Sequence, residues 1–557
     1  MNVAIVNFDA GISLFQDTSV FFKRVLEPAH AVTHLGCNKG LNRCTNIMSC
    51  GIKIDDNWLQ DNKESICRRC KNGQASLMDG SDLLLDPSLD GLNLAQVQIL
   101  KDLAVSQSES VSTYLAVEYD DAALGKLTFF DFAMINKLSH RTRLNAEQRA
   151  GFIEHLKDAF HVWNFISRSL KDNHFDAAIY INGNYSLNAV ARERLSRAGV
   201  KCWSVEYSWA NCEKEKRIYL ERDRLVHCRD WPGLANALST YQCNLADVRI
   251  ATEALRSRIY GVDFNSYSSP VRTTSWDAFD QFNHSFNELV SIFVSSGDEL
   301  LTHEVVYDFV QDDRFFKDQS EWLRFLINNA NPEVGYVVRL HPRLKASKRD
   351  SVQAEEYIYL VEVLEDACKM NNFLIIEADD TISSYYILLQ SELSVVSWSM
   401  VALESVALGI PTIACFPNNM SFPIETMGPL PESLDEIRCY IRREKIPLRT
   451  YEHELAMMKW VGIIYRGIGL SIPGIRYAKN FSDRILAKAQ RFILSSGFLF
   501  SIFYKKRFEG RVFVSPNGKI RLKVGSEPRA IEQTEECLHE FEKFRIEARA
   551  YYKDLAQ

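Results

Sequence analysis

Residues 393–415 read LSVVSWSMVALESVALGIPTIAC, and this stretch decides the fold of the second half of the chain. Leu393–Val396 is a short apolar run that predicts a buried strand, and Met400–Leu408 has the apolar spacing of a helix. A glycine and then a proline follow that helix, as expected at a helix end, and Thr412–Cys415 is another apolar run. A strand, a helix and a strand joined by short turns predict a parallel βαβ unit.

The same alternation extends through the rest of the second half and into the first half. Additional predicted strands of the second half are Leu289–Val294, Gly335–Leu340 and Phe373–Ile376. In the first half, predicted strands are Val3–Val6, Asp176–Ile181 and Lys201–Val205, and predicted helices are Asn145–Leu170 and Ser186–Ala198. Parallel strands connected by helices form doubly wound sheets, which bind ligands at the carboxyl ends of their strands. We therefore expect an α/β protein with two Rossmann-like domains facing a cleft.

The domain limits are predicted from composition. Phe264–Asp280 is rich in serine, threonine and asparagine, which is typical of a junction. We expect an N-terminal domain over residues 1–270 and a C-terminal domain over 280–466. A helical, basic extension is predicted over 467–557, after a stretch rich in glycine and proline.

Composition restricts the class of protein. The 557 residues are 46% hydrophobic, which is enough for more than one core. The net charge of −7 argues against a general nucleic-acid binder, whose domain is usually basic. No apolar stretch reaches the length of about 18 residues that a membrane span needs, and the N-terminus lacks a signal-type leader. We therefore expect a cytoplasmic protein with mostly reduced cysteines.

Two predicted loops of the second half carry groups that suit a phosphate. Arg339, His341 and Arg343 surround the end of one strand and offer positive charge or hydrogen-bond donors. Ser397 and Ser399 follow another strand at the start of a helix, where backbone N–H groups favour an anion. The loops after neighbouring parallel strands converge, so these side chains are predicted to bind the phosphates of one donor molecule.

Three more residues complete the predicted donor site. Ser295 and Ser296 lie in a third loop, and Glu404, one turn into the helix after Ser399, is placed to accept hydrogen bonds from ribose hydroxyls. Each of these features alone has an ordinary structural explanation as a turn, a helix cap or an exposed helix face. Their combination, in order after successive strands, favours a ligand site.

The segments RLHPR (339–343) and SWSMVALESVALGIPTI (397–413) resemble bacterial GT-B glycosyltransferases that build capsule and lipopolysaccharide. The resemblance covers about residues 285–420 and is greatest to the group with an HP motif that includes Kdo and sialic acid transferases. It implies a nucleotide-sugar donor in the C-terminal domain, an acceptor in the N-terminal domain and transfer that needs no metal. It also implies that His341, Ser397 and Ser399 contact donor phosphate and that Glu404 is the family's acidic residue.

One motif of the sialic acid transferases is missing, because Asp120–Asp121 is not followed by glycine, so the donor need not be a CMP-sugar. An inverting transferase needs a general base in an N-terminal loop facing the cleft. Glu206, directly after a predicted strand, is the first candidate, and Asp9 is the second. Asn182 and Asn184 follow the strand between them and are predicted to bind acceptor hydroxyls. Either carboxylate would alternatively cap a loop, and a retaining enzyme would not require such a base.

Five of the 13 cysteines lie within residues 37–70. In a reducing compartment such clustering favours a metal over disulfides, and four thiolates suit structural zinc or an iron–sulfur cluster. The predicted ligands are Cys37, Cys44, Cys67 and Cys70. Cys50 is left over, and His34 is a weaker candidate. The alternative is a loop of unligated cysteines.

The C-terminal extension contains a basic stretch with interleaved aromatic residues over residues 475–510. A basic amphipathic segment can lie on an anionic membrane surface, so peripheral contact with the cytoplasmic face of the inner membrane is one prediction. The alternative is a helix that packs back across the domains.

Three functions fit these patterns. The first is a glycosyltransferase that transfers a sugar from a nucleotide-sugar to a surface polysaccharide or lipid-linked glycan. The second is a glycerol- or ribitol-phosphate transferase of the teichoic-acid type, and the third is a non-catalytic polysaccharide assembly factor.

Overall fold

The structure is a computed structural model. It describes residues 1–48, 56–75, 77, 82–207, 217–222, 244–260, 277–307, 315–346, 352–417, 420, 422–466, 470–472, 481–505, 512–514, 520–522 and 534–555.

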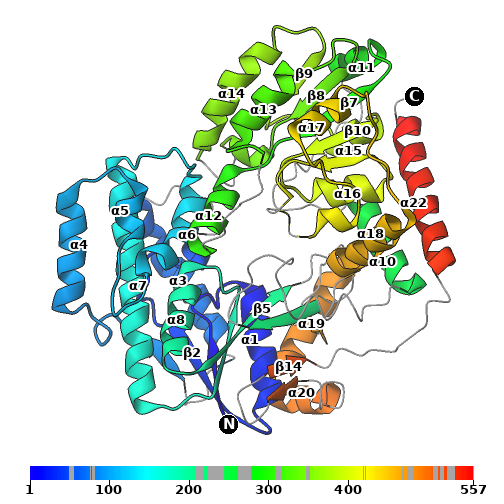
Figure 1. Cartoon of the computed structure of the whole chain (residues 1–557). Coiled ribbons are helices and arrows are strands. Elements are labelled where there is room, and N and C mark those ends of the chain that lie inside the picture. The colour runs from blue at the N-terminus through cyan, green and yellow to red at the C-terminus, as the bar shows by residue number, and fades with distance from the viewer. Residues whose placement is uncertain are drawn as a thin grey trace.

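The chain forms two lobes, each built on its own sheet (Figure 1). Within the described residues, the first lobe has a seven-stranded sheet in the order β12-β6-β5-β4-β1-β2-β3. Its strands are β1 (Asn2–Val6), β2 (Ala31–Cys37), β3 (Leu83–Leu85), β4 (Ala177–Ile181), β5 (Lys201–Tyr207), β6 (Arg217–Arg222) and β12 (Leu470–Ser471). The pairs among β1 to β5 are parallel, whereas β6 and β12 are added antiparallel at one edge.

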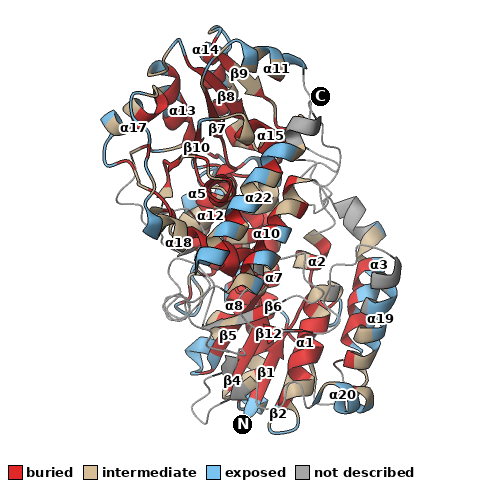
Figure 2. Cartoon of the chain, turned by 90° about the vertical axis from the view of Figure 1, so that its right-hand side faces the viewer, coloured by how far each residue is buried: buried red, intermediate tan, exposed pale blue. Residues whose placement is uncertain are grey.

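The second lobe has a fully parallel sheet, which in the described ranges has five strands in the order β11-β10-β7-β8-β9. Its strands are β7 (Leu289–Phe293), β8 (Gly335–Arg339), β9 (Phe373–Ile376), β10 (Leu393–Val396) and β11 (Thr412–Ala414). These strands are mostly buried because helices cover the sheet, which is why they appear in the sequence as continuous apolar runs (Figure 2). The predicted α/β class with two Rossmann-like domains is confirmed.

Helices surround both sheets. Those of the first lobe are α1 (Ser13–Leu26), α2 (Thr45–Met48), α3 (Asp56–Gln74), α4 (Leu94–Ser106), α5 (Val111–Leu115), α6 (Leu124–Asn136), α7 (Ala146–Asp172) and α8 (Ser186–Arg197). Those of the second lobe are α10 (Leu245–Ile259), α11 (Asp277–His284), α12 (Gly297–Tyr307), α13 (Gln319–Asn328), α14 (Glu355–Ala367), α15 (Ser384–Leu389), α16 (Val401–Ala407), α17 (Leu434–Ile441) and α18 (Tyr451–Val461). The same lobe has the 3-10 helices η2 (Pro342–Leu344) and η4 (Ile424–Thr426) and the π-helix η5 (Gly462–Arg466). Asn145 caps the long helix α7, because its side chain accepts a hydrogen bond from the Gln148 N–H at 2.9 Å.

The C-terminal extension is divided between the lobes. β12 pairs with β6 of the first sheet, and α19 (Phe481–Ser495) and α20 (Gly497–Phe503) lie beside α1 (Figure 1). A hairpin of β13 (Val512–Val514) and β14 (Ile520–Leu522) follows, so the extension is not entirely helical. α22 (Thr534–Leu555) packs on α10 in the second lobe, and Arg256 of α10 pairs with Glu547 at 2.8 Å.

The packing places α10 in the second core, although its residues fall within the predicted domain 1–270. Composition predicted the junction at Phe264–Asp280, after this helix, but the apolar face of α10 packs in the core of the second lobe. No helix in the described ranges is long and apolar enough to cross a membrane.

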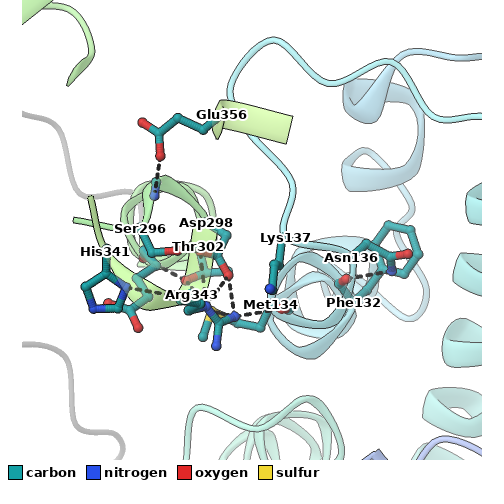
Figure 3. Close-up of polar contacts among 12 residues, drawn as sticks. Phe132, Met134, Asn136, Lys137, Ser296, Asp298, Thr302, His341, Arg343 and Glu356 are labelled. Atoms are coloured by element: carbon teal, nitrogen blue, oxygen red, sulfur yellow. Dashed lines mark hydrogen bonds and ion pairs between the residues drawn. The ribbon is translucent and has the colours of Figure 1, made fainter. Parts of the chain in front are cut away.

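The lobes meet where α6 of the first contacts α12 of the second. Leu301 of α12 is buried in the apolar core of the first lobe. Beside it, the buried Arg343 guanidinium pairs with the Asp298 carboxylate, its Nε lying 3.0 Å from Oδ2, and donates to the Met134 carbonyl of α6 at 2.7 Å (Figure 3). A more exposed pair, Arg141 and Asp318, joins the lobes at 2.6 Å.

Because Asp298 and Arg343 are both buried, removing one partner leaves an uncompensated charge. We expect Asp298→Asn to lower the free energy of unfolding by about 3 kcal/mol or more, measured by urea denaturation. Arg141→Ala, at the more exposed pair of the same interface, should cost less than about 1 kcal/mol. Equal effects of the two changes would contradict a dominant role for the buried pair.

Candidate functional site

Three loops at the carboxyl edge of the second sheet are tied to one another. They follow β7, β8 and β10, which are neighbours in the sheet. The Ser295 hydroxyl after β7 donates to the Trp398 carbonyl after β10, and Arg343 after β8 pairs with Asp298 after β7. The predicted donor residues therefore converge on one edge of the sheet, as the parallel topology required.

His341 is held as a neutral ring. Burial, with the charge of Arg343 adding to it, lowers the pKa of His341 to about 4. Its Nδ1 accepts the Arg343 backbone N–H at 3.2 Å, so the neutral tautomer carries its proton on Nε2. The imidazole therefore presents a neutral N–H donor rather than a positive charge.

The two predicted arginines make protein contacts in this structure. Arg339 donates to the backbone carbonyls of Glu377 at 2.5 Å and Asp380 at 2.8 Å, which anchors the loop after β9. Arg343 bridges Asp298 and Met134, as described above. Both guanidiniums thus shape the loops around His341.

The serines of the site differ in their surroundings. Ser296 donates to Asp298, and Ser397 is fully buried with its hydroxyl 3.5 Å from the Phe293 carbonyl. Ser399 is partly exposed at the start of α16, where its hydroxyl accepts the Val401 N–H at 3.3 Å. Ser399 is therefore the predicted serine most open to a ligand.

The start of α12 is occupied by a carboxyl group of the protein. The Gly297 N–H donates to the Glu356 side chain at 2.7 Å, and burial raises the pKa of Glu356 to about 7. An anionic ligand at this helix start would meet that carboxyl group. Glu356 was missed by sequence reasoning because it lies on α14, about 60 residues away, and only the tertiary structure brings it here.

Glu404 is buried in a polar cluster behind the loops. Its Oε1 lies 3.1 Å from Arg258 Nη2 of α10 and accepts the Tyr465 hydroxyl at 2.7 Å. The sequence predicts that Glu404 accepts hydrogen bonds from ribose hydroxyls. In the structure its carboxylate instead links α16 to α10 and η5. Neither Arg258 nor Tyr465 carries a motif that would have identified it.

In the first lobe, Glu206 is buried near the end of β5. Burial raises its pKa to about 8, and the Ser204 hydroxyl donates to its Oε1 at 3.1 Å. Ser204 in turn accepts the Gly183 N–H at 3.0 Å, which connects Glu206 to the turn after β4. Glu206 is thus a buried carboxyl group, protonated at neutral pH.

The turn after β4 has features of a binding loop. Asn182 has a φ of +52°, an uncommon conformation for a residue other than glycine, and its side chain accepts the Asn184 N–H at 3.1 Å. Asn184 is buried, and its side-chain oxygen has no hydrogen-bond partner among the described residues. Such an orphaned acceptor is costly, which favours a missing partner such as a ligand hydroxyl or a water.

Two more buried carboxyl groups lie nearby. Burial raises the pKa of Asp9 to about 6, and its Oδ1 accepts the Asn46 N–H at 2.9 Å. Asp131 of α6, missed by the sequence analysis, has its pKa raised by burial to about 7. It accepts the Ser186 N–H at 2.8 Å and so caps the start of α8, which is a structural task.

The cysteine cluster borders Asp9. Burial raises the pKa of Cys37 to about 12 and that of Cys70 to about 11, and Cys70 Sγ accepts N–H groups of Gly11 and Asn46, each at 3.1 Å. Within the described ranges, no three or more His, Cys, Asp and Glu side chains form a metal-binding group. The thiols predicted as ligands lie close enough to interact electrostatically, but they are not arranged as a metal-binding group; they are Cys37, Cys44, Cys67 and Cys70. Cys50 lies outside the described residues. The metal stays a prediction.

The sequence matches no family model, and no curated protein matches it significantly. Among solved structures, similarity extends to the UDP-GlcNAc 2-epimerase of Methanocaldococcus jannaschii in complex with UDP-GlcNAc and UDP, with 10% identity over 84% of this chain and 100% of that chain and a TM-score of 0.26. The beta Kdo 2,4 transferase KpsC of Thermosulfurimonas dismutans is 12% identical over 51% of this chain and 79% of its own, with a TM-score of 0.29. An E. coli protein described as trehalose-6-phosphate bound with UDP-2-fluoro glucose is 10% identical over 89% and 99%, with a TM-score of 0.27.

The cysteine prediction is tested by metal analysis. If four thiolates bind zinc or an iron–sulfur cluster, protein purified without chelator should contain bound zinc or iron, and Cys67→Ser combined with Cys70→Ser should remove it. Cys368→Ser, an exposed cysteine elsewhere, is the matched control. Protein that contains neither metal and keeps its unfolding temperature in the double variant would contradict the prediction.

Proposed function

We propose that this chain is a GT-B glycosyltransferase that transfers a sugar from a nucleotide-sugar to a surface polysaccharide or lipid-linked glycan. The observation that carries the proposal is the linkage of the loops after β7, β8 and β10. It gathers a neutral imidazole N–H donor and the Ser399 hydroxyl at one edge of a parallel sheet. That edge is where doubly wound sheets bind phosphate-bearing ligands.

His341 and Ser399 are the proposed direct donor ligands. A neutral imidazole that donates from Nε2 can bind a phosphate oxygen without the cost of burying another charge. Ser399 adds a hydroxyl at the start of α16. Arg339, Arg343, Ser295, Ser296, Ser397 and Glu404 make internal contacts, and we assign them to positioning the loops around the donor.

The first lobe supplies the proposed acceptor side. The buried side-chain oxygen of Asn184 can accept a hydrogen bond from an acceptor hydroxyl, and Asn182 shapes the turn that holds it. Glu206 is the proposed general base, and Asp9 is the second candidate. The α6–α12 contact brings the carboxyl edges of the two sheets toward each other, because α6 contacts Ser186 at the end of the first sheet and Arg343 at the end of the second.

The proposed transfer uses these groups as follows. The acceptor oxygen forms a bond to the anomeric carbon, and its proton passes to the ionised base. The bond between the anomeric carbon and the phosphate oxygen breaks, and its electron pair leaves with the nucleotide. A hydrogen bond from His341 Nε2 would stabilise the charge that develops on the departing phosphate.

Donor binding is tested by thermal unfolding with CMP-, UDP-, GDP- and dTDP-sugars and with CDP-glycerol. One nucleotide-sugar should raise the unfolding temperature, because a ligand at about 100 times its Kd stabilises the folded state by about 2.7 kcal/mol. His341→Ala should weaken binding about tenfold or more through the lost hydrogen bond to a charged group, and so reduce the shift.

His174→Ala, an exposed histidine on the first lobe, is the matched control and should bind normally. A shift with CDP-glycerol alone would replace sugar transfer by transfer of a phospho-alditol. If none of these compounds raises the unfolding temperature, the transferase proposal is contradicted, and the non-catalytic assembly factor is the function that remains.

The base is tested by the pH dependence of sugar transfer. A base must be ionised, so kcat/KM should rise with pH through about 8 if Glu206 acts, and through about 6 if Asp9 acts. Glu206→Gln should lower kcat about 100-fold or more with little change in the donor KM, whereas Glu118→Gln, on an exposed carboxylate, should have no effect. A rise near pH 6 together with an active Glu206→Gln enzyme would transfer the role to Asp9.

A further inference from the structure

The helices α19 and α20 expose several large apolar side chains. They are Ile485, Leu486, Phe492, Phe498, Ile502 and Phe503, here named the tail patch. Phe498 is 75% exposed, Phe492 69% and Phe503 61%. Among the described residues, the other strongly exposed large apolar side chains are dispersed over the chain, and none of them is a phenylalanine.

This exposure is not the result of loose attachment. Leu494 of α19 and Phe500 of α20 are buried in the apolar core of the first lobe. Arg491 pairs with Asp17 of α1 at 2.7 Å, and Arg24 of α1 donates to the Ser495 carbonyl at 3.0 Å. One face of each helix is therefore fixed on the lobe, while the side chains of the tail patch are exposed. Figure 2 shows exposed residues on both helices. A helix that only faces water normally has a polar outer face.

The sequence around the tail patch is mainly basic, although Asp483 lies in α19 and Arg491 is paired with Asp17. Residues 484–507 contain six lysines and arginines and no aspartate or glutamate, although the whole chain has a net charge of −7. Lys488 of α19 and Lys505, which lies two residues after the end of α20, are both exposed. Aromatic and aliphatic side chains beside lysines suit a surface that is apolar inside and anionic outside.

We propose that the tail patch docks the protein on the surface of an anionic phospholipid bilayer. The phenylalanines would enter the boundary between headgroups and acyl chains, and the lysines would contact headgroup phosphates. In both views α20 lies at the end of the first lobe away from the second lobe, so docking there leaves the α6–α12 region uncovered (Figures 1 and 2).

The charge also argues against a second copy of the chain as the occupant. A two-fold dimer through this face would bring the exposed Lys488 and Lys505 of one copy toward those of the other. Such a contact is disfavoured, whereas an anionic bilayer gains from the same charges.

The experiment is co-sedimentation of the full chain with vesicles of phosphatidylcholine alone or with about one third phosphatidylglycerol. We expect binding to the anionic vesicles, weak binding to phosphatidylcholine, and loss of binding when salt rises from about 0.1 to about 0.5 M. Phe498→Ser, Ile502→Ser and Phe503→Ser together should lower the partition coefficient at least tenfold, and Lys488→Glu with Lys505→Glu should lower it at least as much.

A triple variant of Leu94→Ser, Val105→Ser and Leu448→Ser is the matched control, because these exposed apolar residues lie elsewhere and should leave binding unchanged. Equal binding by the tail-patch variants and the control, or no binding by the original chain, would overturn the proposal. So would a dimer in size-exclusion chromatography that the tail-patch variant alone converts to a monomer, because the patch would then be a protein interface. The readout is binding rather than transfer, so the outcome is independent of the proposed enzymatic function.

Discussion

The buried pair of Arg343 and Asp298 is the contact on which the two-lobed arrangement depends. Arg343 lies just after the end of β8, and Asp298 lies at the start of α12 after the neighbouring strand β7. The same guanidinium donates to the Met134 carbonyl of the other lobe. A buried cation is tolerated only when its hydrogen bonds are satisfied, so the loop after β8, the start of α12 and the end of α6 are held in one geometry. His341 lies two residues from this contact, and its position follows from it.

The same burial sets the protonation of the candidate site. Desolvation keeps His341 neutral and makes Glu206 and Glu356 hold their protons to higher pH than usual. Beside the charged pair of Arg343 and Asp298, the candidate site therefore contains a neutral imidazole and carboxyl groups whose pKa values are raised to about 7 and about 8. Groups of this kind can become charged or exchange protons when a phosphate-bearing ligand or an acceptor arrives, and clusters of shifted carboxyl groups are typical of functional sites.

Much of the candidate site in the second lobe could be predicted because it depends on local order along the chain. Apolar runs, helix ends and the residues directly after strands place His341, Ser397 and Ser399 at the carboxyl edge of one sheet whatever the details of packing. The partners of these residues could not be predicted. Glu356 of α14 accepts a hydrogen bond at the start of α12, and Arg258 of α10 pairs with Glu404. Neither contact follows from apolar periodicity or from a motif. The extension was similarly recognised as basic and apolar, but not as a segment shared between both lobes.

By itself the sequence determined the α/β class, the two sheets and the sheet edge at which the candidate ligand-binding residues lie. These features follow from the period of apolar residues, about 2 in strands and about 3.6 in helices, and from the residues that form turns. Only the tertiary structure decided which charges are neutralised inside the protein, which lobe each helix joins and which apolar face of α19 and α20 stays exposed. These properties depend on contacts between residues tens to hundreds of positions apart, and hydrophobic burial, which drives such contacts, is not directional enough to specify them from local pattern.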